Sequence, residues 1–287
     1  MTTESESGGA NAEQIAFWND VGGPRWVREQ ALLDEQLDPV GRQAIDASGV
    51  RAGEMVIDVG CGCGSTSLEL ARRVGPRGKV TGVDISRPML HLARERAARE
   101  SLAQTEFVAA DAQSHRFRPG YDLVFSRFGV MFFDDPVAAF TNLHGTLKPS
   151  GRMAFLCWQA LHRNPWMALP MMAAMKHVTF DAPASPDAPG PFALADAARV
   201  QSILERAGFR DIATGGLDAE LSIGGRLELD ETVRFVLELG PLARALAQQS
   251  ADVRAAVARE VRLSLEPFQG PDGVKMAGAM WIVTAGA

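Results

Sequence analysis

Short apolar runs alternate with amphipathic stretches through residues 51–158 of the chain. Between the runs, apolar side chains recur every three or four residues, as at Leu68, Ala71 and Val74, which is typical of a helix with one buried face. Strands that alternate with helices indicate a parallel sheet covered on both faces. The pattern predicts an α/β fold with a doubly wound, mostly parallel sheet, whose strands are Met55–Val59, Lys79–Asp84, Glu106–Asp111, Tyr121–Ser126 and Arg152–Cys157.

The segments on either side of this core have different patterns. The pattern in residues 12–50 predicts two or three helices, with a break at Gly22-Gly23-Pro24. We expect these helices to form an N-terminal cap. Residues 1–11 are polar and have no apolar run, so they predict a disordered tail rather than a signal peptide.

The alternation stops after Trp158. Residues 159–194 hold a Met-rich helical piece and a proline-rich loop, and we interpret them as an insert that forms the substrate pocket. In residues 195–287 the pattern predicts a helix, a strand near 209–223, helices at about 230–247 and 251–266, and a last strand at 274–283. This part supplies the remainder of the sheet with a helical insertion.

Composition narrows the classes of partner. The chain has 287 residues, 46% of them hydrophobic, and a net charge of −6 without an evident basic face, so nucleic acid is not expected to bind. No apolar stretch approaches the ~20 residues that span a bilayer, and we expect a cytoplasmic protein, with a homodimer possible. Cys61, Cys63 and Cys157 are an odd number without a second Cys/His pair, which favours neither disulfides nor a metal site.

A glycine-rich turn follows the first strand. Asp58 precedes Gly60-Cys61-Gly62-Cys63-Gly64, and a helical pattern starts directly afterwards. Glycines permit positive φ and close approach of a ligand, and the helix N-terminus offers unpaired N–H groups. The third glycine comes one residue earlier than in the dinucleotide fingerprint G-x-G-x-x-G. The turn favours a nucleotide-like ligand, with a purely structural turn as the alternative.

Polar residues also stand at the ends of the next three strands. Strand 2 ends in Asp84, strand 3 in Asp111-Ala112, and strand 4 in Ser126-Arg127-Phe128. In open parallel sheets, ligands bind at the carboxyl ends of the strands, and an acid at the end of strand 2 can accept hydrogen bonds from ribose hydroxyls. Any one of these residues alone is compatible with an ordinary turn, but together they indicate one site.

These stretches resemble the small-molecule branch of class I methyltransferases that depend on S-adenosylmethionine (SAM). The resemblance covers about residues 50–160 well and the rest in outline. It rests on Val56–Gly64, Val83–Ser86, Ala109–Ala112 and Lys148–Gly151.

The resemblance implies a Rossmann-like SAM site that releases S-adenosylhomocysteine. The turn would face the methionine and ribose, Asp58 would orient the ammonium group, and Asp84 would hold the ribose. Asp111 would take the adenine amino group. The cofactor-binding residues implied are Asp58, Gly60, Cys61, Gly62, Gly64, Asp84, Ile85, Met89, Asp111, Ala112, Ser126 and Arg127.

The acceptor is less well defined by the sequence. Aromatic residues favour a hydrophobic small molecule, with ordinary core packing as the alternative; the candidates are Trp18, Trp26, Phe128, Phe132, Trp158 and Trp166. The candidates for a catalytic role are His162 and His177 in the insert, and Arg127 at the end of strand 4. Arg127 either binds a substrate carboxylate or pairs with a structural acid.

Asn164-Pro165-Trp166 is similar to the Asn-Pro-Pro-Tyr motif of adenine methyltransferases, but it follows strand 5 instead of strand 4 and lacks the second proline. DNA base methylation is therefore not expected. The sequence predicts methyl transfer to a small hydrophobic metabolite, at an O, N or C atom that stays open. The alternatives are a catalytically silent SAM-binding protein and an NAD-dependent oxidoreductase.

Overall fold

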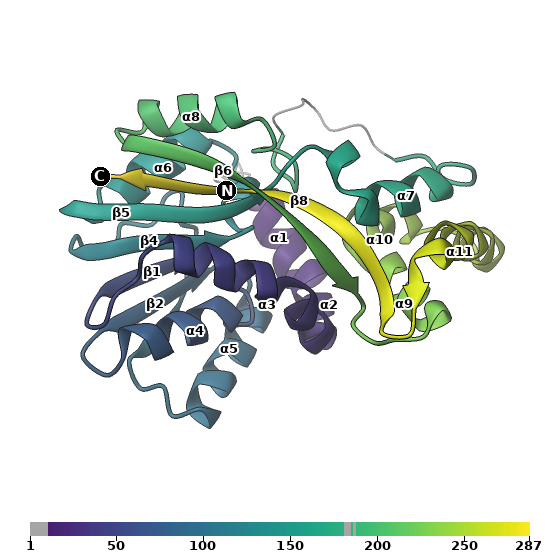
Figure 1. Cartoon of the computed structure of the whole chain (residues 1–287), viewed down its shortest axis with the longest axis horizontal. Helices are drawn as coiled ribbons and strands as arrows, with labels where there is room; N and C mark the ends of the chain where they lie inside the picture. The colour runs from purple at the N-terminus through teal and green to yellow at the C-terminus, as the bar shows by residue number, and fades with distance from the viewer. Residues whose placement is uncertain (1–10, 181–184, 186–187) are drawn as a thin grey trace, which may run out of the picture.

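The computed structural model describes residues 11–180, 185 and 188–287 (Figure 1). Its eight-stranded sheet has the order β3-β2-β1-β4-β5-β8-β6, and β7 pairs with β8. β1 to β5 are mutually parallel, whereas β8 runs antiparallel to both β5 and β6. The expected doubly wound, mostly parallel fold is confirmed. The strands are β1 (Met55–Val59), β2 (Lys79–Asp84), β3 (Thr105–Ala109), β4 (Tyr121–Arg127), β5 (Leu147–Trp158), β6 (Arg210–Ile223), β7 (Gln269–Gly270) and β8 (Gly273–Gly286).

Helices cover the sheet and form a lobe beside it. The α-helices are α1 (Ala12–Asp20), α2 (Gly22–Arg28), α3 (Gln30–Ala47), α4 (Ser65–Val74), α5 (Arg87–Arg99), α6 (Pro136–His144), α7 (Pro165–Ala174), α8 (Ala197–Arg206), α9 (Leu229–Leu237), α10 (Gly240–Leu246) and α11 (Ala251–Leu265). Short 3₁₀ turns are η1 (Val130–Phe132), η2 (Leu161–Arg163) and η3 (Glu266–Phe268). The prediction of a single helix at 230–247 is wrong, because the segment forms two helices. Gly240 has a positive φ, and Pro241 has no backbone N–H to donate, so a continuous helix is interrupted there.

The central strands are apolar along their whole length. Val56 and Ile57 in β1 are fully buried although they point to opposite faces, and so are Leu123 and Val124 in β4. Burial on both faces explains why these strands lack an apolar–polar alternation. The last strand of the chain extends three residues beyond its predicted end, and β3 stops at Ala109, so Asp111 lies in the following loop.

The β6–β8 pair is longer than the parallel core. β5 pairs with β8 only as far as Trp158 and Met280, while β6 and β8 stay paired to Ile223 and Val274. This extension curves past the carboxyl ends of the parallel strands to the lobe of α7, α9, α10 and α11 (Figure 1), in which α7 packs against α11. The lobe therefore stands beside the edge of the sheet where a ligand is expected.

Helix α3 runs along the sheet with its N-terminal half at that same edge. Near its C-terminus, the Ser48 carbonyl accepts a hydrogen bond from Nε of Arg152 (2.6 Å), which lies six residues before the end of β5 at Trp158. Nearer its N-terminus, Asp38 pairs with Arg127, the last residue of β4 (2.8 Å). Residues of α3 before Asp38 therefore lie beyond the ends of the parallel strands.

Candidate functional site

The three glycines of the turn have different roles. Their φ values are 66° at Gly60, 54° at Gly62 and 85° at Gly64, a region that favours glycine. A Cβ on Gly60 would lie 2.6 Å from Cα of Gly129, and one on Gly64 would lie 3.0 Å from Cβ of Ala93. Among the residues that the structure describes, a Cβ on Gly62 would meet only Met89 Sδ, at 3.8 Å. Close packing thus requires the outer two glycines, while the backbone of Gly62 stays open to a ligand.

Asp58 lies under the turn and is fully buried. Its Oδ2 accepts hydrogen bonds from the hydroxyls of Thr66 (2.7 Å) and Ser67 (2.6 Å) at the start of α4. Its Oδ1 is buried without a partner among the described residues. Burial raises the pKa of Asp58 to about 6. An unpaired carboxylate oxygen can accept a hydrogen bond from an ammonium group, so Asp58 fits the expected ligand.

Asp84 joins the turn to the loop after β2. One of its carboxylate oxygens accepts the backbone N–H of Gly62 and the other accepts that of Ser86, both at 2.8 Å. Burial raises the pKa of Asp84 to about 6. Each oxygen keeps a further lone pair for a ribose hydroxyl. Two more of the implied cofactor-binding residues lie in or next to this loop, Ile85 half-buried and Met89 buried.

Asp111 is held by a residue that the sequence did not single out. Its Oδ2 accepts a hydrogen bond from Nδ2 of Asn11 (2.9 Å), and its Oδ1 accepts the backbone N–H of Gln113 (2.9 Å). The carbonyl of Ala112 accepts from Asn142 (2.9 Å). Asn11 was assigned to the predicted tail, and nothing in its local sequence indicates that it is buried. The other tail residues lie outside the described part of the chain.

Arg127 contacts an acid of α3. Its guanidinium pairs with Asp38, and only 10% of its side chain is exposed. Asp38 also accepts a hydrogen bond from the hydroxyl of Ser65, at the start of α4. One turn earlier, Asp34 pairs with Arg96 (2.7 Å), which also donates to the carbonyl of Cys63 (2.8 Å). Of the two interpretations of Arg127, the structure shows pairing with an acid.

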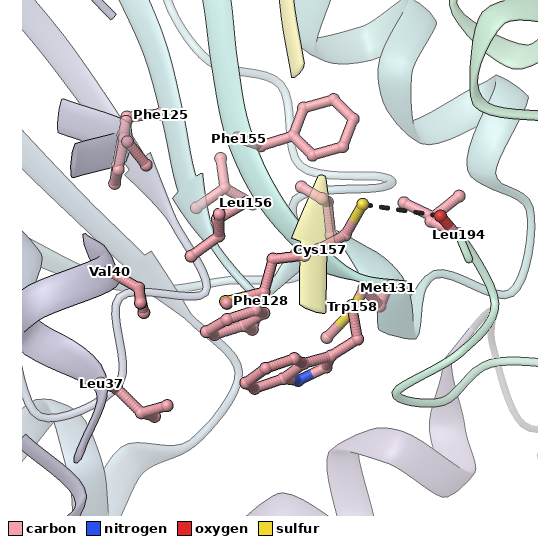
Figure 2. Packing of buried hydrophobic residues seen from close by; sticks show 14 of the residues in the cluster. Leu37, Val40, Phe125, Phe128, Met131, Phe155, Leu156, Cys157, Trp158 and Leu194 are labelled. Atoms are coloured by element: carbon pink, nitrogen blue, oxygen red, sulfur yellow. Dashed lines mark hydrogen bonds between the residues drawn. The ribbon is translucent and has the colours of Figure 1, made fainter. Parts of the chain in front are cut away.

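The loop after β4 carries backbone strain. Ser126 Oγ donates to the carbonyl of Val59 (2.8 Å) and accepts from the N–H of Gly129 (3.2 Å). Phe128 has φ +62°, which is unusual for a large side chain and costs free energy. Its ring stacks on Trp158, with 4.2 Å between centroids and 5° between planes. Figure 2 shows this pair beside Leu37 and Val40 of α3.

The six candidate aromatic residues form two groups. In the first group, the ring centroid of Trp166 lies 5.1 Å from that of Trp158, which is stacked on Phe128. In the second, the ring centroid of Trp18 lies 5.5 Å from that of Phe132 and 5.9 Å from that of Trp26, and both contacts are edge-on. The carbonyl of Trp18 accepts a hydrogen bond from Ser86 Oγ (2.7 Å), which places α1 over the loop that carries Asp84.

The two histidine candidates do not lie at the glycine turn. His162 lines a separate cavity of about 480 Å³, whose other lining residues are Gln159, Ala160, Arg163, Ala195, Gly216, Asp218 and Trp281. His177 is exposed near Glu260 of α11. Residues 11–180, 185 and 188–287 contain no group of three or more His, Cys, Asp or Glu that could hold a metal ion. The helices in those ranges are too short or too polar to cross a membrane.

Residues 56–151 match a protein family described as Methyltransferase domain. The chain is 35% identical over 122 residues to aklanonic acid methyltransferase DauC of Streptomyces sp. (strain C5), covering 42% of this chain and 56% of that protein. It is 36% identical over 149 residues to demethylmenaquinone methyltransferase of Staphylococcus aureus (strain JH9), covering 51% and 61%. The matches thus span a little over half of each relative.

Solved structures share the fold at low sequence identity. The YcgJ protein from Bacillus subtilis has a TM-score of 0.56 at 15% identity, with 85% of this chain and 96% of that chain covered. The [4+2]-cyclase SpnF has a TM-score of 0.54 at 20% identity, with 87% and 80% covered. Because one of these proteins is named a cyclase, the fold alone does not define the reaction.

Proposed function

We propose that this chain, whose residues 56–151 match the methyltransferase-domain family, transfers a methyl group from SAM to a small hydrophobic molecule. Two features of the glycine turn carry the proposal together. The backbone of Gly62 is open to a ligand, and an oxygen of Asp58 beneath the same turn has no hydrogen-bond partner among the described residues. A ligand that lies along this backbone and carries a cationic donor would satisfy that oxygen. SAM has such a donor in its ammonium group.

The residues of the chain bind and orient in this proposal. Asp58 accepts from the ammonium group, Asp84 from the ribose hydroxyls and Asp111 from the adenine amino group. When SAM is bound it supplies a methyl group already activated on a sulfonium, so alignment of the acceptor is the main requirement. Orientation of two reactants contributes on the order of 7–11 kcal/mol to such reactions.

Aromatic side chains would form the acceptor site. Phe128 follows the end of β4, and the Trp158 ring stacked on it belongs to the last residue of β5. Phe128 precedes Gly129, which packs on Gly60 of the turn. Trp18 and Trp26 come from α1 and α2 and exclude water from above. The names of the two relatives, for aklanonic acid and demethylmenaquinone, support the same class of acceptor. A small molecule rather than nucleic acid also agrees with the net charge of −6.

Methyl transfer is tested with SAM carrying a labelled methyl group. The protein is incubated with aklanonic acid or demethylmenaquinone, the latter in its oxidised and reduced forms, and labelled product and S-adenosylhomocysteine are quantified. The matched control is Asp58→Asn, which keeps the shape of the side chain and removes its charge. Product formation that depends on Asp58 supports the proposal. Tight binding of S-adenosylhomocysteine without transfer would indicate a catalytically silent SAM-binding protein, and binding of NAD in its place would indicate an oxidoreductase.

A further inference from the structure

Gln36 of α3 is a buried polar residue with an unsatisfied acceptor. Only 3% of its surface is exposed, and its Oε1 has no hydrogen-bond partner among the described residues. Buried polar atoms are almost always paired, so an unpaired amide oxygen in the interior requires an explanation. Asp58 Oδ1, under the glycine turn, is a second such atom. The proposed cofactor accounts for Asp58 but not for Gln36.

The helix geometry places Gln36 at the edge of the sheet where the acceptor is expected. Residues four apart lie on one face of a helix, so Gln36 lies one turn before Val40. Figure 2 shows Leu37 and Val40 pointing toward the stacked Phe128 and Trp158. One turn of helix is about 5.4 Å, and α3 runs with its N-terminus beyond the strand ends. Gln36 therefore lies about one helical turn beyond Val40, toward the edge of the sheet where a ligand is expected.

The neighbours of Gln36 along the helix are directed elsewhere. Asp34 and Asp38, two residues to either side, pair with Arg96 and Arg127 beside the glycine turn. The side chain of Glu35 lies against Gly225, at the far end of the β6–β8 extension. Gln36 thus lies between the glycine turn and the β6–β8 extension. In the described part of the chain, neither side supplies a donor to its amide oxygen.

We propose that Gln36 determines acceptor specificity by accepting a hydrogen bond from a hydroxyl group on a flat aromatic acceptor. The inference rests on the proposed function, and it adds the class of acceptor, a hydroxylated aromatic ring. The ring would lie against the stacked Phe128 and Trp158, which favours flat apolar surfaces. Its hydroxyl would then pair with Oε1 of Gln36. A site with a buried unpaired acceptor rejects analogues that lack the matching donor.

The test uses 1-naphthol and 1-methylnaphthalene, which differ mainly in the hydroxyl group. Binding of each to the protein saturated with S-adenosylhomocysteine is measured by quenching of tryptophan fluorescence. We expect the wild type to bind 1-naphthol about tenfold more tightly than 1-methylnaphthalene. Gln36→Met, which keeps the length of the side chain, should abolish this preference. The control Gln43→Met changes an exposed glutamine of the same helix and should keep it.

Thermal unfolding gives a second readout that needs no aromatic ligand. Removing an unpaired buried amide should leave the melting temperature of ligand-free Gln36→Met equal to or above that of the wild type. A lower melting temperature than that of Gln43→Met would show that Gln36 is a bonded structural residue and would overturn the inference. Equal binding of the two naphthalenes, or no binding of either, would overturn it as well. The proposed function fails separately, if S-adenosylhomocysteine itself does not bind.

Discussion

The carboxylate of Asp84 accepts the backbone N–H of Gly62 at 2.8 Å, so the end of β2 directly holds the open position of the glycine turn. Its other oxygen holds Ser86, whose hydroxyl reaches the carbonyl of Trp18. One buried carboxylate therefore links the turn, the loop after β2 and, through Ser86, helix α1. If SAM binds as proposed and α1 and α2 (residues 12–28) act as a lid, this carboxylate would couple the cofactor to the lid.

Asp84→Ala should weaken binding of S-adenosylhomocysteine by roughly 1.5–3 kcal/mol, the range for a hydrogen bond to a charged group. The same change leaves two N–H groups without their acceptor, so we also expect a loss of about 1–3 kcal/mol in the free energy of unfolding. Titration calorimetry and urea unfolding measure the two effects. Asp122→Ala removes a carboxylate paired with Lys148 away from the turn and serves as the control. Equal affinities of the two variants would contradict the role of Asp84.

Gly62→Ala and Gly60→Ala should have different consequences. A Cβ on Gly62 meets no backbone atom, so Gly62→Ala should fold with only the strain of a positive φ, about 1 kcal/mol. It should nevertheless lose cofactor binding because the methyl group fills the ligand's path. A Cβ on Gly60 would lie 2.6 Å from Cα of Gly129, so Gly60→Ala should melt at a clearly lower temperature. If Gly62→Ala bound S-adenosylhomocysteine normally, the turn would be structural only.

The glycine turn could be predicted from the sequence, but the different roles of Gly60 and Gly62 could not. Strand, glycines and helix follow one another within a few residues, so local pattern is enough to recognise them. Which glycine packs and which stays open depends on Gly129, in a loop far along the chain. Asp34 and Asp38 were missed for the same reason, since a helical acid gives no local sign of the arginine it faces. The position of His162 could not be predicted either, because the cavity that it lines also includes Trp281, on the last strand.

Stability should depend on pH through Asp58. Burial raises its folded-state pKa to about 6, above the value of about 4 of an unfolded chain. Between these values the folded protein binds more protons at Asp58 than the unfolded one, so the contribution of Asp58 to stability is fully present below pH 4 and is lost as the pH rises through 6. Asp84 contributes in the same direction. Urea unfolding of the ligand-free protein at pH 4.5 and 6.5 should show the fall, and Asp58→Asn should reduce it.

Cofactor binding should show the opposite dependence on pH. The ammonium group favours the ionised form of Asp58, so affinity for S-adenosylhomocysteine should rise by up to about tenfold per pH unit between pH 5 and 6. Calorimetry near pH 5.5 in two buffers of different ionisation enthalpy should detect protons released on binding. Proton uptake, or an affinity that is constant over this range, would exclude Asp58 as the partner of the ammonium group.

The lid is attached to the cofactor loops mainly by polar contacts. Asn11 donates to Asp111, and Asn19 donates to the carbonyl of Ile85 (2.9 Å) and accepts the N–H of Arg87 (3.0 Å). No residue of α1 is buried, so its apolar contacts, such as those of Trp18 with Phe132 and Trp26, lie partly exposed to water. Segments of this kind open locally at little free energy. The contacted loops are the ones expected to hold the adenine and ribose, so a bound cofactor should stabilise the closed lid.

Amides of residues 12–28 should therefore exchange hydrogen quickly in the ligand-free protein and slowly with S-adenosylhomocysteine bound. Asn11→Ala should speed exchange in α1, whereas Gln201→Ala on α8 should not. A chain that begins at residue 31 should keep a folded sheet and lose turnover, because water then reaches the reacting groups. If α1 and α2 instead form a permanent part of the core, their protection will be the same with and without ligand, and the shortened chain will unfold. Hydrogen-exchange mass spectrometry and circular dichroism together distinguish a gate from a fixed cap.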